Sequence, residues 1–67
     1  MHAIRTPTRD EIKHGSTVMI IKKADQPTGR VTEGKVKKIL TTSPSHPHGI
    51  KVMLESGEVG RVQGIVS

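Results

Sequence analysis

The sequence predicts a small all-β protein that folds as one domain, and three observations carry this prediction. The chain has 67 residues, which is enough for a single domain at most. Its apolar residues occur in short runs rich in Val and Ile that are separated by Gly, Pro and Ser, as in strands joined by turns. Five such runs fall within about fifty residues. Closing them into a barrel would leave no free sheet edge.

The five expected strands are short apolar or β-branched runs bounded by turn residues, and they span residues 17–22, 30–41, 50–54, 58–62 and 65–66. The strand at 50–54 has the cleanest alternation of apolar and polar residues. In the strand at 30–41, Gly34 and the loss of alternation near Lys38 indicate a bend or bulge.

Turn signals separate these strands. The loop 42–49 has two prolines that cannot donate to a β-ladder, and it closes on a glycine. The segment 55–58 is expected to form a tight hairpin. Gln63-Gly64 is expected to form a turn before the last short strand.

The polar N-terminal segment is expected to stand apart from the barrel. Residues 1–11 are predicted to be a flexible arm, and residues 12–67 the barrel domain. A short helical turn is expected at 9–13, with Thr8 as its N-cap.

The composition excludes several kinds of chemistry. The chain has no cysteine, so it forms no disulfide, thiolate nucleophile or cysteine-ligated zinc site. It also has no Phe, Trp or Tyr. The core must therefore consist of Val, Ile, Leu and Met. The aromatic platforms on which most single-strand binders stack bases are missing.

The location is expected to be cytoplasmic. The lack of cysteine suits a reducing interior. No apolar run approaches the ~20 residues that span a membrane. Residues 1–13 contain no apolar segment of the kind that secretory signals carry. We therefore expect no membrane partner.

Two patterns in the sequence resemble known families. The spacing Ile12-x-x-Gly15-x-x-Val18, followed by Gly34-x-Val36-x-x-Ile39, resembles the glycine and valine pattern of SH3-like and KOW-type barrels. The run TSPSHPHGIKV at 42–52, with GRVQ at 60–63, is similar to the YwbE-like family of small bacterial and archaeal proteins. This resemblance covers about residues 12–67 and implies a compact β-barrel with a housekeeping-like role, which agrees with the five-stranded SH3-like barrel expected from the strand pattern. The family has no assigned reaction. KOW-type barrels often sit on ribosomal RNA or transcription machinery, which is an analogy at the level of the fold.

The charge of the chain favours polyanions. Eleven Lys and Arg against six Asp and Glu give a formal charge of +5. Lys35 and Lys37 share a strand face opposite Val36, and Lys51 projects from the next strand. We expect these three lysines to lie side by side as a phosphate-binding face. The alternative is an ordinary solvated lysine face.

The loop 42–49 is the most distinctive segment. Its hydroxyls and its two histidines can donate hydrogen bonds to phosphate, and imidazole can partly replace the missing aromatics in base stacking. The alternative is a rigid structural loop. The residues expected to bind nucleic acid on these grounds are Arg30, Lys35, Lys37, Lys38, Ser43, His46, His48, Lys51 and Arg61.

Arg30 and Arg61 each follow a glycine, and their planar guanidinium suits phosphate. For Arg61 the structural alternative is an ion pair with Glu58 or Glu33, and its place among the core strands favours that alternative.

Metal binding and catalysis are both poorly supported. His46 and His48 are one residue apart, but no Asp or Glu lies near them in the sequence, so no metal or other cofactor is expected. The carboxylates are all expected to be exposed, without the apolar setting that raises a pKa for acid–base work. We therefore expect a binding module and not an enzyme.

The leading hypothesis is a monomer that binds structured RNA through phosphates, with the ribosome as one candidate partner. A protein-interaction module that uses the loops or a sheet edge is the second hypothesis. A small hydrolase or metal protein is a distant third.

Overall fold

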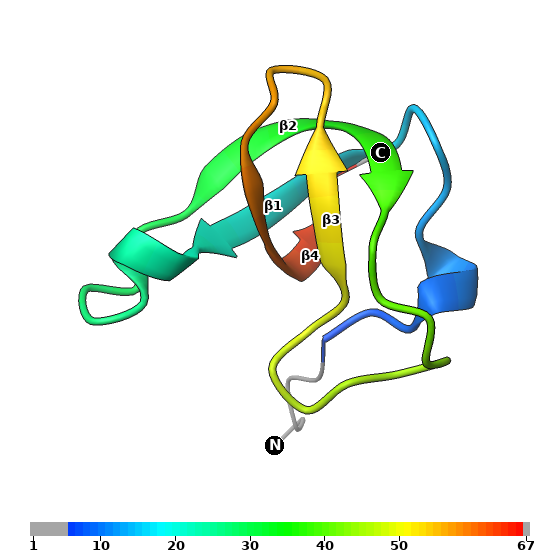
Figure 1. Cartoon of the computed structure of the whole chain (residues 1–67), viewed down its shortest axis with the longest axis horizontal. Coiled ribbons are helices and arrows are strands. Elements are labelled where there is room, and N and C mark those ends of the chain that lie inside the picture. The colour runs from blue at the N-terminus through cyan, green and yellow to red at the C-terminus, as the bar shows by residue number, and fades with distance from the viewer. Residues whose placement is uncertain (1–5, 67) are drawn as a thin grey trace.

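The computed structural model describes residues 6–66, and it shows a closed antiparallel barrel with strand order β1-β2-β3-β4 (Figure 1). The last strand pairs back with the first, so the sheet closes on itself. The strands are β1 (Thr17–Lys22), β2 (Thr32–Ile39), β3 (Lys51–Leu54) and β4 (Val59–Ile65). Two single-turn 3₁₀ helices complete the order, η1 (Arg9–Glu11) and η2 (Lys23–Asp25). The prediction of a small all-β barrel of the SH3-like type is confirmed.

The core is built by strand alternation. In β3, Val52 and Leu54 are buried, while Lys51, the first residue of the strand, is exposed. The buried side chains are all aliphatic, as the composition requires, and burying each one contributes roughly 1.5–3 kcal/mol. They are Ile12, Val18, Ile20, Val36, Ile50, Val52, Leu54 and Val62.

The predicted fifth strand is wrong, because the turn expected at Gln63-Gly64 is a bulge inside β4. Ile20 of β1 pairs with Val62, and the next residue, Met19, pairs with Gly64. Gln63 is therefore the extra residue on β4. Glycine at position 64 leaves room for the Met19 side chain, because a Cβ there would lie only 3.0 Å from Met19 Cε. The chain bends at this point and continues to Ile65 as one strand.

The second strand is shorter than predicted, spanning Thr32–Ile39 in place of 30–41. The predicted kink near Lys38 is confirmed, because the register with β3 shifts between Val36 and Lys38. As a result Lys37 and Lys38 are both exposed, although they are consecutive.

The described part of the N-terminal arm lies against the loop 42–49. The Arg9 backbone N–H donates to the Pro44 carbonyl at 2.8 Å, and Thr6 Oγ1 donates to the His46 carbonyl at 3.3 Å. The predicted helical turn is present as η1, which ends at Glu11 and not at residue 13. Glu11 accepts from the Thr8 backbone N–H at 2.8 Å. Residues 1–5 of the expected arm lie outside the described residues.

Candidate anion-binding groove

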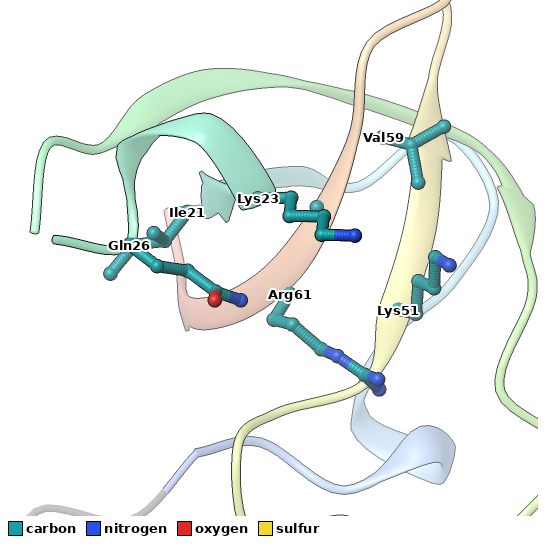
Figure 2. Close-up of a pocket in the computed structure, with 7 residues that line it drawn as sticks. Ile21, Lys23, Gln26, Lys51, Val59 and Arg61 are labelled. Atoms are coloured by element: carbon teal, nitrogen blue, oxygen red, sulfur yellow. The ribbon is translucent and has the colours of Figure 1, made fainter.

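A groove of about 490 Å³ crosses the outer face of the barrel over β1, β4 and β3 (Figure 2). We call it the basic groove. Three cations come to it from three different elements. The residues that line it are Ile21, Lys23, Gln26, Lys51, Val59, Gly60 and Arg61.

Strand register explains why these cations converge. Arg61 of β4 pairs with Lys51 of β3 on one side and with Ile21 of β1 on the other. Directly paired residues project from the same face of a sheet. Lys23 follows β1 immediately as the first residue of η2. In Figure 2, Lys23 extends toward the strand that carries Lys51, and Arg61 lies below the two.

Gly60 allows the strands at the floor of the groove to approach closely. A Cβ at this position would lie 2.7 Å from the Ile21 carbonyl oxygen and 2.9 Å from Ile20 Cδ1. The first of these neighbours is backbone, which cannot move without shifting β1. Glycine at position 60 therefore holds Arg61 close to β1.

Arg61 is anchored, but not by the ion pair considered from the sequence. Its Nη1 donates to the Gly49 carbonyl at 3.3 Å, which ties the guanidinium to the end of the loop. Glu58 pairs with Lys22 at 2.8 Å. The expectation of an Arg61–Glu58 or Arg61–Glu33 pair is therefore wrong. A guanidinium has five N–H donors, so this single bond leaves others available in the groove.

Lys22 pairs with two carboxylates, those of Asp25 and Glu58, whose chain neighbours Gln26 and Val59 line the basic groove. Its Nζ lies 2.8 Å from Glu58 Oε2 and 4.0 Å from Asp25 Oδ2. The hydrogen bond to Glu58 raises the pKa of Lys22, while the same bond and a second one from Ser56 lower the pKa of Glu58. Within residues 6–66, no carboxylate lines the basic groove.

The Lys22–Glu58 pair should make stability depend on pH. Because the pKa of Glu58 is lowered in the folded state, its contribution is present above the usual carboxyl pKa and is lost as the pH falls through the folded pKa. The contribution of Lys22, whose pKa is raised, is lost only as the pH rises through its folded pKa. Replacing Glu58 with Gln should therefore lower the thermal midpoint slightly at neutral pH and leave it unchanged in acid.

The matched control for this prediction is Glu33→Gln, which removes an exposed carboxylate that has no ion pair within the described residues. Calorimetry of both variants from acid to alkaline pH measures the difference. An equal loss in the two variants at neutral pH would show that the pair contributes nothing specific.

A second hollow of about 170 Å³ adjoins the basic groove, and we call it the polar hollow. It shares three residues with the basic groove and adds His48 and Gln63. Gln63 Nε2 donates to the His48 carbonyl at 3.1 Å and to the Arg61 carbonyl at 3.3 Å. Its lining residues are Ile21, Gln26, His48, Arg61 and Gln63.

The loop 42–49 holds His48 beside this hollow through internal hydrogen bonds. His46 Nδ1 accepts from the His48 backbone N–H at 3.1 Å, so this nitrogen carries no proton in the bonded state. The Gly49 N–H donates to the His46 carbonyl at 3.0 Å. The two imidazole rings lie 5.7 Å apart, inclined at 45°. The loop is therefore an ordered wall of the site.

The structure brings only three of the nine predicted binding residues to these hollows: Lys51, Arg61 and His48. The expected row of Lys35, Lys37 and Lys51 is wrong. Lys51 pairs with Arg61, and the Glu55 N–H bonds the Lys35 carbonyl at the far end of β3. The bend in β2 and its register against β3 thus place Lys35 about four residues, or ~13 Å, from Lys51 along the strand. In the closed strand order, β2 also lies opposite β4.

The other predicted residues are dispersed. Lys38 is exposed opposite Met53 on the β2–β3 side. Arg30 is exposed after η2, where its charge acts against that of Lys22. Ser43 is exposed in the loop 42–49. His46 is half-buried, and its Nδ1 accepts the hydrogen bond from the His48 backbone N–H within the same loop. None of the four lines the basic groove or the polar hollow.

Sequence reasoning missed Lys23, Gln26 and Gln63 as site residues. Lys23 and Gln26 fall in what reads as a plain polar loop, and η2 is too short to leave a periodic signal. The available clue was Ile21, an apolar residue on the outward face of β1, which indicates that something covers that face.

Among residues 6–66 there is no group of three or more His, Asp or Glu side chains arranged to hold a metal ion. Over the same residues, no helix is long and apolar enough to cross a membrane.

The fold and the groove together define the class of protein: a small basic SH3-like barrel with a cationic groove on its outer face. The chain belongs to the DUF2196 family, described as an uncharacterized conserved protein, which it matches over residues 5–65. It is 59% identical over 59 residues to the uncharacterized protein YwbE of Bacillus subtilis (strain 168), covering 88% of this chain and 91% of the relative. The resemblance to a YwbE-like family is therefore confirmed. No solved structure matches the chain significantly.

Proposed function

We propose that this protein binds RNA through phosphate contacts in the basic groove. The observation that carries the proposal is the convergence of Lys23, Lys51 and Arg61 from three different elements. Within the described residues no carboxylate lines this groove, and Asp25 and Glu58, which adjoin lining residues in the sequence, are engaged by Lys22.

The pairing of Lys51 with Arg61 supports an anionic ligand. Like charges directly opposite each other on a sheet are destabilising. A phosphate between them turns that repulsion into two attractions. The Arg61 guanidinium offers a planar fork for two phosphate oxygens, while the two lysines supply point charges.

The overall charge and composition favour RNA among the anionic ligands. The formal charge of +5 on a chain of this size suits a polyanion. The absence of Phe, Trp and Tyr favours contacts with backbone and shape over aromatic stacking. Similar barrels of the KOW type work on RNA, which supports the proposal by analogy of fold. A monomer that acts in the cytoplasm, in association with the ribosome or translation, is part of this proposal.

The closed strand order disfavours the competing protein-interaction function. Each of the four described strands has a neighbour on both sides, so no open edge is available for a partner strand. The groove also lacks the aromatic side chains that line proline-rich peptide grooves.

Chemical-shift mapping with an RNA hairpin tests the proposal. Adding the hairpin to isotope-labelled protein should shift the backbone amides of residues 21–26, Lys51 and 60–61 most strongly. A peptide nucleic acid of the same base sequence, which has no phosphates, should leave those amides unchanged. If the hairpin shifts nothing, or shifts only β2, the proposed function is overturned.

A further inference from the structure

We propose that the basic groove and the polar hollow together hold one unpaired nucleotide, with its phosphate in the basic groove and its base in the polar hollow. This inference rests on the proposed function and specifies what kind of RNA the site takes. The two hollows share Ile21, Gln26 and Arg61, so they adjoin each other, and we call the two together the depression.

The two halves differ in chemistry as the two halves of a nucleotide do. The basic groove has Lys23 and Lys51 in addition to the shared Arg61. The polar hollow replaces those lysines with an imidazole and a second amide, from His48 and Gln63. Positive charge thus falls away along the depression, while uncharged hydrogen-bonding groups take its place.

Gln26 is the side chain best placed to contact a base edge. Its side-chain amide makes no hydrogen bond with any described residue, and the residue is exposed at the end of η2. In Figure 2 it extends from η2 toward Arg61. An amide presents both donors and an acceptor, which matches the mixed edge of a nucleobase. Gln63, by contrast, uses its amide nitrogen to hold the walls of the hollow.

Ile21 and His48 supply surfaces for the flat faces of a base. Ile21 is half-buried on the outward face of β1 and gives the depression an apolar floor. His48 is exposed, and its ring is one of the few planar rings in a chain that has no Phe, Trp or Tyr. Splayed-out RNA bases stack on planar side chains, histidine among them, and form hydrogen bonds along their edges.

A paired base cannot use this site, because its Watson–Crick edge is already engaged and its faces are stacked. The basic groove, which would take the phosphate, has a volume of about 490 Å³, within the roughly 300–1,000 Å³ typical of small-ligand sites, and the polar hollow adds about 170 Å³ for the base. The depression therefore fits a nucleotide from a single-stranded or looped segment.

Fluorescence anisotropy with two RNAs of equal charge tests this inference. One is a short single-stranded RNA, and the other is the same chain with every base removed. The wild-type protein should bind the abasic chain about tenfold more weakly, since it loses about one hydrogen bond and the apolar contact. Gln26→Ala should bind the intact RNA more weakly and should discriminate less between the two chains. Thr42→Ala, an exposed loop residue outside both hollows, should behave like the wild type.

Each outcome of this experiment is decisive. Equal binding of the two chains by the wild type overturns the inference and leaves phosphate binding in place. Binding of the hairpin but of neither single strand also overturns it. If the hairpin fails to bind as well, the proposed function itself is overturned.

Discussion

Replacing Lys23 and Lys51 together with glutamine should weaken the binding of an RNA hairpin about 100-fold in about 0.1 M salt. Each replacement removes one charge-assisted contact to phosphate, worth about 1.5 kcal/mol, and 1.4 kcal/mol corresponds to tenfold in affinity. Glutamine keeps the aliphatic stem of lysine and removes only its charge. Arg61 is left intact, because its bond to the Gly49 carbonyl also supports the loop. Anisotropy titrations give the dissociation constants.

The chain offers a control with the same change in net charge. Lys35 and Lys37 are exposed on β2, which lies opposite β4 in the barrel. Replacing both with glutamine lowers the net charge equally, yet their distance from the groove means that salt largely screens their effect. We expect a loss of about threefold or less in this variant. Equal losses in the two double variants would mean that the RNA responds to total charge and not to the groove.

Gly49→Ala should destabilise the fold by about 3 kcal/mol or more, which is a large part of the stability of a small domain. Gly49 is buried and has φ +102°, a conformation that costs an alanine about 1–2 kcal/mol. A Cβ at this position would also collide with the Val62 carbonyl oxygen, which is part of the β4 backbone. Because the chain has no Trp or Tyr, unfolding is followed by far-ultraviolet circular dichroism in urea.

Gly57→Ala separates these two costs. Gly57 has φ +94°, close to that of Gly49, but a Cβ there meets nothing within 4 Å. Its replacement should cost only the conformational penalty of about 1–2 kcal/mol. If the two variants unfold at the same urea concentration, the collision with β4 has been overestimated.

The barrel could be predicted from the sequence because alternation and turn residues act locally. The pattern around Val52 and Leu54 marks an inward face without any knowledge of the partner strand. The kink near Lys38 could be predicted for the same reason, since a broken alternation is visible in the sequence. These features depend on the chain's own periodicity.

The strand count could not be predicted, because a turn and a bulge carry the same sequence signal. Gln63-Gly64 has the composition of a turn, but pairing with Met19 and Ile20 keeps both residues in the sheet. Only the partner strand decides between the two. Long-range pairing of this kind leaves no trace in a local pattern.

The site was predicted in part, for a related reason. The basic character of the protein and the choice of Lys51 and Arg61 as candidate residues follow from charge and alternation, and both residues line the basic groove. Lys23 lines the same groove only because of how the chain turns at η2, which no local pattern predicts. Lys35 was expected beside Lys51 because the register between β2 and β3 cannot be predicted from the sequence. A basic patch can thus be predicted from composition, whereas the members of a groove require the fold.

The salt dependence of RNA binding tests the central claim most directly. On single strands, the slope of log affinity against log salt is about −0.7 per phosphate contact. Three contacts in the basic groove predict a slope near −2 for the wild type and for the Lys35/Lys37 double variant. The Lys23/Lys51 double variant, which keeps one contact, should show a shallower slope of about −0.7. A slope that is the same in both double variants would contradict a phosphate site built from Lys23, Lys51 and Arg61.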